Sequence, residues 1–535
     1  MEDSRTNQKS LNPGVPIGVF VSWDNRTRVR SGYRILMGGS PWRMIRLDDR
    51  SAAFAREIHA AGRLGVSVAS DWESKAAREL MARGFVYPGV ATASEKIDKS
   101  SPKSADYCVV IPVLDRAKQL AELLNLVRIH DGGVAEIIVV DDGSENAAEI
   151  AEVATAFGAR LVRLPSNKGP GAARNAGAHI ASKPFIAFLD SDCMPTAMWV
   201  EQLFHYFKDP TVGVVAPRIK TIAEDSSVLQ QFEVSRSSLD MGCFPDHVKK
   251  GGRLSYVPSA ALVVRREVMD CINFEESMRV GEDVDFMWRV SEAGWCVNYD
   301  PSVFVQHRSR AGLRSWFVRT FEYGTSAALL ESRHPDSLAP ARLSGWNVGI
   351  LAGLVFDKKV GALMLAVIAS GTLACRLRQL PRPIPTAIQI ASYGLMADIE
   401  QVGRLLRREW WPVGLGILAS VPKSKMGRRG VLIMFAPIII DWRLENQRLD
   451  LCRYALMRCA QDLAYGSGVI NSAVRAQVWR PLQPEVSYPT VITSRVISSV
   501  REFGHKLGSS KTFPKFSRFV SKRWASDASS SGYTP

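Results

Sequence analysis

The sequence predicts an α/β fold whose central part, about residues 106–330, is a mostly parallel sheet covered by helices on both faces. Four apolar, β-branched runs alternate there with segments of helical spacing, and the runs occupy 107–113, 136–140, 160–164 and 185–189. An apolar run without polar alternation is typical of a strand buried on both faces. Alternation of strands and helices is typical of a parallel sheet, in which the helices form the crossover connections.

Composition narrows the class of protein. At 535 residues the chain is too long for one core, and its 46% hydrophobic and 23% charged residues exclude global disorder. The basic excess, 68 − 53 = +15, comes without zinc-finger spacing, an RNA-binding aromatic motif or a basic zipper. It therefore favours an anionic substrate or lipid, and we expect no nucleic-acid partner. Eight scattered cysteines without a C-x-x-C pair, and a polar start without a signal sequence, predict a cytoplasmic location.

A small α+β module is expected at residues 1–90, ahead of the sheet. Its pattern predicts two short strands, two helices and a closing strand, at 18–22, 33–37, 52–61, 72–82 and 84–88. From 91 to 105 the apolar signal disappears and Ser, Lys and Ala dominate. Such a stretch is typical of a linker, so the sheet domain is expected to begin after it.

Residues 331–450 are expected to form a helical, membrane-associated region. Apolar segments such as Trp346–Phe356, Val360–Cys375 and Gly430–Ile440 alternate there with clusters of Lys and Arg. None reaches the roughly 18 to 20 apolar residues that a spanning helix needs. The pattern favours helices at the inner face of the cell membrane, with cations on lipid headgroups, and buried helical hairpins are the alternative. Residues 451–535 are expected to be a basic, partly disordered tail.

Acidic side chains follow the strands of the predicted sheet. Asp115 follows the first strand, Asp142 the second, and Asp190 and Asp192 the fourth. In such sheets ligands bind at the carboxyl ends of the strands. A D-x-D pair is costly unless donors or a cation offset the repulsion, and a hard divalent ion binds through carboxylates plus substrate phosphates. We therefore expect Mn²⁺ or Mg²⁺ as cofactor, with Asp192 as a ligand; a solvated turn or a helix cap is the alternative.

Two further motifs favour a nucleotide. Asp142 can accept a hydrogen bond from a nucleobase imino group while Gly143 permits a tight turn, and a capped strand-to-helix turn is the alternative. The glycine-rich helix start Asn167–Asn175 favours an anionic ligand. It is not a dinucleotide fingerprint, because Arg174 stands where the third glycine would be.

The segment Gly281–Asp285 predicts a general base. A carboxylate such as Asp283, close to a metal and among aromatic residues, suits the removal of a proton from a sugar-type hydroxyl. Glu282 and Trp288 are expected on the acceptor side, since aromatic faces stack on sugar rings, and core packing is the alternative for Trp288. His307, at the end of another strand, is expected as a further metal ligand or as a structural histidine.

Five motifs in one order resemble those of family 2 glycosyltransferases with the GT-A fold. They are Val110–Val113, Val140–Ser144, Gly169–Gly177, Phe188–Asp192 and Gly281–Asp285. Further blocks, among them Leu36–Pro41 in the front module, Ser255–Ala261 and Arg333–Asp336, resemble the glycosyltransferases of the mycofactocin system. The resemblance covers residues 15 to about 345.

The resemblance implies an inverting hexosyltransferase that moves a sugar from a UDP-sugar, with UDP-glucose the expected donor, in a single displacement. The implied acceptor is a small peptide-derived redox cofactor precursor or a glycan. Asp142 would contact the uracil, Asp190 the ribose and Asp192 the metal, and Asp283 would be the base. The implied nucleotide-sugar site comprises Pro112, Asp115, Asp142, Asn167, Gly169, Arg174, Asn175 and Asp190. The front module resembles small winged-helix domains that bind precursor peptides or pathway proteins; a structural cap is the alternative.

Three other functions remain open from the sequence. One is a UDP-sugar-dependent transferase that acts on a lipid or polysaccharide at the membrane. Another is a nucleotidyltransferase, which would carry a glycine-rich first loop and a basic residue where this chain has Pro112–Arg116. The third is a membrane-surface scaffold without activity, against which Asp190, Asp192 and Asp283 speak.

Overall fold

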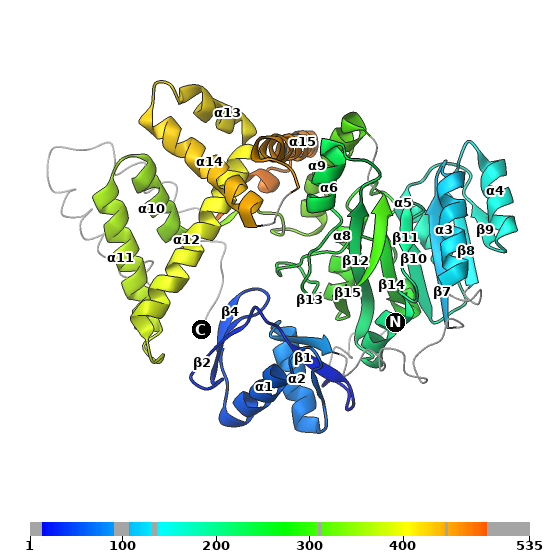
Figure 1. Ribbon diagram of the computed structural model, residues 1–535, viewed down its shortest axis with the longest axis horizontal. Helices are drawn as coiled ribbons and strands as arrows, with labels where there is room; N and C mark the ends of the chain where they lie inside the picture. Colours follow the sequence, from blue (N-terminus) through cyan, green and yellow to red (C-terminus); the bar gives the residue numbers. More distant parts are fainter. Residues whose placement is uncertain (1–12, 90–105, 131–135, 309–311, 445–447, 489–535) are drawn as a thin grey trace, which may run out of the picture.

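The computed structural model describes residues 13–89, 106–130, 136–308, 312–444 and 448–488. A front module, a sheet domain and a helical region can be distinguished (Figure 1). The expected linker at 91–105 and most of the expected tail lie outside the described residues.

The sheet domain is built on a nine-stranded mixed sheet. Parallel β9 (Arg160–Arg163), β8 (Glu136–Asp141), β7 (Tyr107–Val113) and β10 (Phe185–Leu189) lie side by side in that order. Antiparallel β14 (Ala261–Arg265) lies between β10 and β12 (Val212–Ile222), and β12 pairs in parallel with β15 (Cys296–Arg308). The short strands β11 (Cys193–Pro195) and β13 (Asp246–His247) both pair with β15. The predicted α/β fold is confirmed, although β14 runs against the others beside it.

Helices cover both faces of this sheet and create two hydrophobic cores. Successive residues of β7 alternate between them, since Val109 and Ile111 belong to one core and Cys108 and Val110 to the other. The first core includes α3 (Ala117–His130), α4 (Ala147–Ala156) and η3 (Glu201–Lys208), and the second includes α5 (Pro170–Ile180), α7 (Arg266–Cys271) and α8 (Glu282–Glu292). Each fully buried aliphatic side chain contributes about 1.5–3 kcal/mol, so these cores fix the sheet edge that carries the acidic residues.

The front module has its own core around Trp23, Phe54 and Ile58. Its elements are β1 (Phe20–Trp23), β2 (Arg28–Arg30), β3 (Ile35–Gly38), β4 (Arg43–Arg46), α1 (Asp49–Ala61), β5 (Val66–Ser67), α2 (Asp71–Ala82) and β6 (Val86–Gly89). Side-chain caps begin both helices, because Asp48 accepts from the N–H of Ser51 and Ser70 from that of Glu73. The strands and helices expected there are present, and β2, β4 and β5 are further strands that the sequence analysis did not predict.

Ion pairs fix the front module to the sheet domain. Arg78 of α2 donates to Asp209 over 2.6 Å, and both side chains are more than 90% buried. Asp24 and Asp246, one from each part, share Arg26, which lies 3.1 Å from Asp246. Loss of one partner of such a buried pair strongly destabilises the folded protein, so the pair holds the two parts in one arrangement.

The helical region contains seven helices among the described residues, and every apolar segment expected there is helical. They are α9 (Leu313–Arg333), α10 (Gly345–Val355), α11 (Lys359–Arg376), α12 (Pro383–Arg407), α13 (Trp411–Ser420), α14 (Lys425–Leu444) and α15 (Leu451–Ala476). Beyond them, η4 (Arg480–Leu482) precedes β17 (Glu485–Ser487), which pairs with β16 (Arg342–Ser344). Helix α6 (Val228–Arg236) of the sheet domain packs beneath α9 and α15.

The first part of the expected tail forms helix α15, which the sequence analysis did not predict. Helix α15 packs along α9, and glycines make the close approach possible: a Cβ on Gly324 would lie 2.1 Å from the carbonyl oxygen of Tyr465. Leu449, Tyr454 and Met457 are buried against α6 and α9. The basic excess of residues 451–535 gave no indication of this helix, in which Gly468 and other small residues face α9.

Candidate functional site

Asp142 joins the loop after β8 to the start of α5. Its two carboxylate oxygens accept hydrogen bonds from the N–H groups of Lys168, over 2.7 Å, and of Gly169, over 2.8 Å. Gly143 has φ +79°, and a Cβ there would lie 2.6 Å from the backbone of Ser166, so only glycine fits between the loops. Burial raises the pKa of Asp142, and the two N–H groups oppose this shift. Each carboxylate oxygen has a second lone pair, so a nucleobase donor can still be accepted.

Asp115 connects the loops that follow β7 and β8. Its backbone is left-handed, with φ +53°, and its carboxylate accepts from the N–H of Glu145 over 2.7 Å. Ser144 caps this turn, because its Oγ accepts from the N–H of Asp115 over 2.9 Å. Pro112, on β7, is half-buried beside Val140 of β8. Asp115 therefore holds the edge of the expected nucleotide site in place.

The D-x-D pair is neutralised by cations. Asp192 forms an ion pair with Arg116, and its other oxygen lies 3.3 Å from Nε2 of His307. Asp190 accepts from Arg174 over 2.7 Å. Burial by itself would raise the pKa of Asp192, but the hydrogen bond from His307 and the charges of His307 and Arg116 lower it below its usual range. Asp192 is therefore ionised at neutral pH.

The chemistry of this donor set fits a divalent metal ion. Asp192 and His307 offer a carboxylate oxygen and an imidazole nitrogen on neighbouring strands, since β11 pairs with β15 and Cys193 lies opposite His307. Within the described part of the chain, no group of three or more His, Cys, Asp or Glu side chains is placed to bind a metal. Hard divalent ions usually complete their coordination with water and substrate phosphates, so two protein ligands suffice.

Arg174 is the centre of the site rather than a free anion-binding group. It is 2% exposed, and its two terminal nitrogens donate to Asp190 and, over 3.1 Å, to Glu282. Glu282 is 7% exposed and is held by Arg174. We therefore expect Glu282 to position its neighbour Asp283 rather than to touch the acceptor. Through Arg174, helix α5 links the D-x-D pair to the start of α8.

Asp283 lies in the first turn of α8 and has the ionisation behaviour of a base. Gly281, with φ +83°, precedes the helix, and the carboxylate of Asp283 accepts from the N–H of Val284 over 2.8 Å. Burial, followed by the negative charge of Glu282, raises the pKa of Asp283 to about 7. A base is most efficient when its pKa lies near the working pH.

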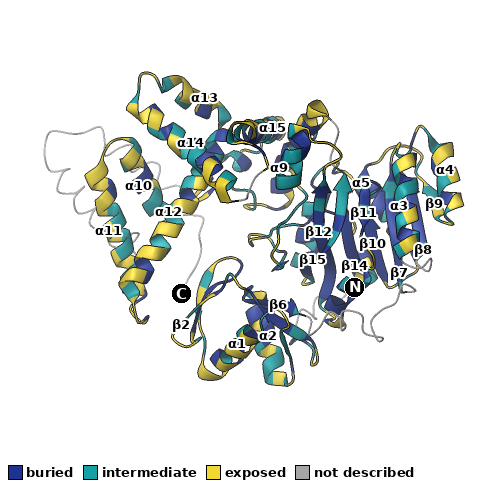
Figure 2. Ribbon diagram, in the orientation of Figure 1, coloured by how far each residue is buried: buried dark blue, intermediate teal, exposed yellow. Residues whose placement is uncertain are grey.

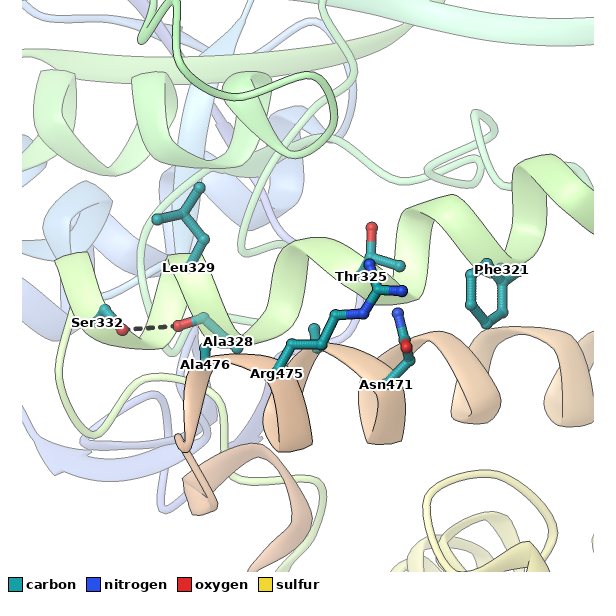
Figure 3. Close-up of a pocket in the computed structure, with 9 residues that line it drawn as sticks. Phe321, Thr325, Ala328, Leu329, Ser332, Asn471, Arg475 and Ala476 are labelled. Carbon is teal, nitrogen blue, oxygen red and sulfur yellow. Dashed lines mark hydrogen bonds between the residues drawn. The ribbon is translucent and has the colours of Figure 1, made fainter.

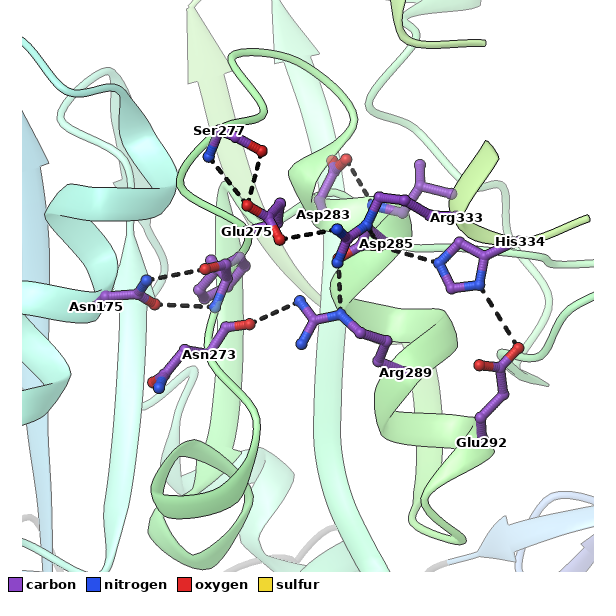
Figure 4. A network of polar contacts seen from close by, with 12 residues as sticks. Asn175, Asn273, Glu275, Ser277, Asp283, Asp285, Arg289, Glu292, Arg333 and His334 are labelled. Carbon is purple, nitrogen blue, oxygen red and sulfur yellow. Dashed lines mark hydrogen bonds and ion pairs between the residues drawn. The ribbon is translucent and has the colours of Figure 1, made fainter. Parts of the chain in front are cut away.

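Asp285, two residues further along α8, has a structural role (Figure 4). It is fully buried and accepts from Arg289 and Arg333 over 2.7 Å each and from Nε2 of His334 over 3.0 Å. Although burial opposes it, these donors lower the pKa of Asp285. The network ties the end of α9 to α8, which accounts for the Arg333–Asp336 block in the sequence.

Three expected contact residues are engaged elsewhere. Trp288 is 3% exposed and donates from Nε1 to the carbonyl of Ser255 over 2.8 Å. Because its ring faces are buried, they are closed to a sugar ring. The expectation that Trp288 lies on the acceptor side is therefore corrected to its alternative, core packing. The amide of Asn175 is paired with the backbone N–H and carbonyl of Phe274, which positions that loop (Figure 4). Asn167 is exposed and hydrogen-bonded to Arg279, and it stays at the rim of the site.

Two further arginines belong to the site. Arg116, which the sequence places with Asp115 directly after the first strand at the ligand-binding edge, pairs with Asp192. Arg279 packs over Gly169, where a Cβ would lie 3.2 Å from its side chain, and donates to Asn167. No local motif marks Arg279, because it reaches the site from a loop more than 100 residues away in the chain.

A cavity of about 460 Å³ lies away from the acidic residues, between α9 and α15 (Figure 3). Its polar side chains are those of Thr325, Ser332, Asn471, Ser472 and Arg475, and its larger apolar ones are those of Phe321 and Leu329. None of the acidic residues of the sheet edge lines it. The expected ligands therefore belong to the open edge of the sheet and not to this cavity.

Comparison with known proteins agrees with this geometry. The Glycosyl transferase family 2 model matches residues 108–272. A pre-mycofactocin glycosyltransferase of Mycobacterium tuberculosis is 34% identical over 486 residues, which cover 88% of this chain and 98% of that protein. The match thus extends beyond the 15–345 range that the motifs indicated. Glycosyltransferase AglE of Haloferax volcanii is 25% identical over 210 residues, or 38% of this chain and 66% of its own.

Similarity to solved structures is weaker. A mannosyltransferase of Pyrobaculum calidifontis, in complex with GDP-Man and Mn²⁺, is 15% identical with a TM-score of 0.39, over 71% of this chain and 90% of its own. S. aureus TarS 1–349 is 18% identical with a TM-score of 0.34, over 43% and 66%. Both scores are too low to bear on the site. The GT-A-type sheet, its acidic edge and the near-complete match to the mycobacterial enzyme show instead that this chain is a hexosyltransferase of glycosyltransferase family 2.

Proposed function

We propose that the protein transfers glucose from UDP-glucose to a hydroxyl of a peptide-derived redox cofactor precursor, with inversion at the anomeric carbon. The observation that carries the proposal is the position of Asp283, a carboxyl group with a pKa of about 7, beside the ion-paired D-x-D edge. The acceptor class rests on the name of the mycobacterial relative, pre-mycofactocin glycosyltransferase. A glycan acceptor is the second possibility within the same chemistry.

The donor is expected to lie along the carboxyl ends of β7, β8 and β10. Asp142 would accept from the uracil, and Asp190, with one oxygen held by Arg174, would accept from the ribose. Asp192 and His307 would hold a divalent ion, which when bound neutralises the charge that grows on the leaving diphosphate. Arg116, already beside Asp192, adds a second positive charge at this position.

Asp283 is expected to act on the opposite side of the sugar. It takes the proton of the acceptor hydroxyl while that oxygen forms its bond to the anomeric carbon. The bond from the anomeric carbon to the diphosphate oxygen breaks, and its electron pair leaves with UDP. One base and no enzymatic nucleophile are required, because the acceptor oxygen itself attacks the anomeric carbon. This agrees with separate roles for Asp283, whose carboxyl group can gain and lose a proton near neutral pH, and Asp192, which stays ionised.

Membrane association is a further part of the proposal, and the surface of α11 and α12 supports it. Val360, Leu363 and Val367 of α11 and Ile384 and Ile388 of α12 are all more than half exposed (Figure 2). Among the described residues, α11 is the one helix that is both long enough and apolar enough to cross a bilayer, and 6% of it is buried inside the protein. An exposed apolar surface that spans two helices usually marks an interaction site.

The charges around α11 favour anionic lipid. Lys358 and Lys359 lie at the start of the helix, Arg376 is its last residue, and Arg378 and Arg382 follow it, all of them exposed. Cations at both ends of an apolar helix suit headgroup contact. We expect the full-length protein to float with phosphatidylglycerol vesicles, and a Leu363→Glu, Val367→Glu double variant to remain in solution. Equal flotation of both proteins would remove α11 from the membrane contact.

For the front module we propose a structural role that leaves room for partner binding. Its buried ion pair with the sheet domain favours the cap, while Trp42, 57% exposed, and Met44, 41% exposed, offer an apolar edge at β4. The binding role is tested by the difference in tryptophan fluorescence between wild type and Trp42→Phe, titrated with a synthetic precursor peptide. An unchanged spectrum at millimolar peptide would leave only the cap.

A donor screen tests the catalytic proposal as a whole. The purified protein is incubated with several UDP-sugars and Mn²⁺, and UDP release is measured with and without a hydroxyl-bearing acceptor. We expect the fastest release from UDP-glucose and none after chelation of the metal. Release that is unaffected by chelation would contradict the metal site, and failure to bind UDP at all would favour a scaffold without activity.

A further inference from the structure

Asp142 depends for its orientation on a surface loop, residues 167–169, which we call the donor loop. Asn167 and Lys168 are exposed, so burial contributes little to fixing this loop. The loop rests on Gly143, because a Cβ there would lie 2.7 Å from the backbone nitrogen of Asn167. The carboxylate of Asp142 accepts from the N–H groups of Lys168 and Gly169 over 2.7 and 2.8 Å. The direction of the lone pairs that Asp142 keeps for a nucleobase therefore depends on the backbone of the donor loop.

Arg279 anchors the donor loop from a part of the chain more than 100 residues away. Its Nη1 donates to Oδ1 of Asn167, and its Nη2 donates to the backbone carbonyl of the same residue over 2.9 Å. Its side chain also packs over Gly169, where φ is +99° and an added Cβ would lie 3.2 Å from Cδ of Arg279. Because a guanidinium group is planar and rigid, two bonds to one residue fix the orientation of that residue as well as its distance.

The segment that carries Arg279 is itself held in place (Figure 4). Glu275 lies 2.9 Å from Arg333 of α9 and accepts from the hydroxyl group of Ser277 over 2.7 Å. Met278, directly before Arg279, is 1% exposed. Arg279 therefore projects from a fixed backbone, and its two bonds restrain the donor loop.

The same segment leads to Asp283, four residues beyond Arg279. Gly281, between them, has φ +83°, and a Cβ on it would lie 2.8 Å from the side chain of Ser326. The backbone is therefore held against α9 just before the base. An unbroken series of packed and bonded groups connects Asp142 with Asp283 through the donor loop and Arg279, and such a series can couple two sites.

We propose that Arg279 is a positioning residue that fixes the donor loop and couples donor binding to the placement of Asp283. A nucleobase bound at Asp142 restrains the donor loop, and through Arg279 the segment before Asp283 is held at a fixed distance from the donor. Direct contact of Arg279 with the donor is disfavoured, because both of its terminal nitrogens already donate to Asn167. This inference rests on the proposed function, since it takes Asp142 as the nucleobase acceptor and Asp283 as the base.

Titration calorimetry of the full-length protein with UDP and Mn²⁺ tests the effect on the donor loop. Arg279→Met is expected to weaken UDP binding about tenfold, the effect of losing two hydrogen bonds from a charged donor. Asn167→Ala removes one of these bonds and is expected to weaken binding about threefold. In the double variant the affinity is expected to equal that of Arg279→Met, because both changes break the same contact.

Two further measurements separate positioning from charge. Arg279→Lys keeps the positive charge but cannot make both bonds in the same geometry, so it is expected to bind UDP as weakly as Arg279→Met. At saturating donor, kcat of Arg279→Met is expected to fall about tenfold, because displacement of a catalytic group by about 1 Å can cost up to about 10²-fold. Arg56→Met in the front module is the matched control, because Arg56 is an exposed arginine that also donates to a backbone carbonyl, that of Gly32. The control is expected to keep the affinity and kcat of wild type.

Thermal melting shows which variants are folded, and Asn167→Ala, which changes an exposed side chain, decides the test if an Arg279 variant does not fold. Unchanged UDP affinity in Asn167→Ala, or full rescue by lysine, would overturn the positioning role. Equal losses from Arg279→Met with and without Asn167→Ala would overturn it too, since Arg279 would then contact the donor directly. Unchanged kcat in Arg279→Met would overturn the coupling to Asp283. Absence of UDP binding by wild type would contradict the proposed function itself, and this inference with it.

Discussion

The sheet edge at Asp192 and the start of α8 at Asp283 place the same side chain in opposite electrostatic surroundings. At the sheet edge both carboxylates of the D-x-D pair face a guanidinium group: Asp190 faces Arg174, and Asp192 faces Arg116. At the start of α8, Asp283 is partly buried beside another acid, Glu282. The first arrangement keeps charge permanently in place, as a metal and phosphate site requires, whereas the second lets a proton come and go near neutral pH. From this difference we propose that the sheet edge binds the donor and that Asp283 transfers the proton.

The largest expected effect is on turnover at the start of α8. Replacement of Asp283 by Asn removes the base but keeps its size, so kcat is expected to fall by about 10²- to 10⁴-fold. The affinity for UDP, measured by titration calorimetry, is expected to stay within twofold, because the donor is bound at the other region. If turnover survives the Asp283→Asn change, the base lies elsewhere.

The pH dependence sharpens the same assignment. Because the pKa of Asp283 is about 7, kcat/KM is expected to rise tenfold per pH unit below 7 and to level off above it. The folded-state pKa is raised, so protonation favours the folded state, and this contribution is present below about pH 4 and lost as the pH rises through 7. The Asp283→Asn variant is therefore expected to have a higher Tm than wild type at pH 8 but not at pH 4. Equal Tm differences at both pH values would contradict the raised pKa.

A second large effect is expected on stability and not on chemistry. Asp285 accepts from three donors and is fully buried, so Asp285→Asn is expected to lower the free energy of unfolding by about 3 kcal/mol, as the loss of one partner of a buried ionic network does. Denaturant unfolding measures it. Glu292→Gln, half exposed at the edge of the network, is the control and is expected to cost less than about 0.5 kcal/mol. Equal losses in both variants would argue against a structural role special to Asp285.

The smallest effect is expected at the sheet edge. Mutation of a residue that only hydrogen-bonds to a metal ligand typically lowers metal affinity about 10- to 100-fold. Asp192→Asn removes a ligand itself, so it is expected to weaken Mn²⁺-assisted UDP binding by at least about tenfold. Binding of UDP without metal serves as the reference for each protein. Should the two proteins show the same gain on addition of Mn²⁺, Asp192 is not a ligand.

Sequence patterns were sufficient for the elements of the sheet and insufficient for side-chain partners. The strand Tyr107–Val113 was predicted with its observed bounds, because a short, unbroken apolar run rich in β-branched residues is typical of a strand buried on both faces. Asp283 and Asp285 stand in the same short motif. The charge that acts on Asp283 comes from its neighbour Glu282, whereas Asp285 is bonded to Arg333 and His334, which the packing of α9 on α8 brings near.

The errors have a similar cause. Trp288 was expected beside an acceptor, but its indole N–H finds the carbonyl of Ser255 inside the core. Helix α15 was hidden within a basic stretch, because composition averages over its ordered first part and the residues beyond it. Contacts between segments more than 100 residues apart, such as Arg279 with Asn167, leave no periodic signal in a single sequence.

The ion pair between Arg78 and Asp209 has a consequence for how the molecule comes apart. Both side chains are almost fully enclosed, so lifting α2 away from the sheet domain would strand two opposite charges in surroundings with little water. Partial detachment of the front module therefore costs more free energy than its small contact with the sheet domain suggests. We expect the two parts to melt as one cooperative unit with a single calorimetric peak. Any peptide captured at β4 would consequently sit at a constant distance from the base.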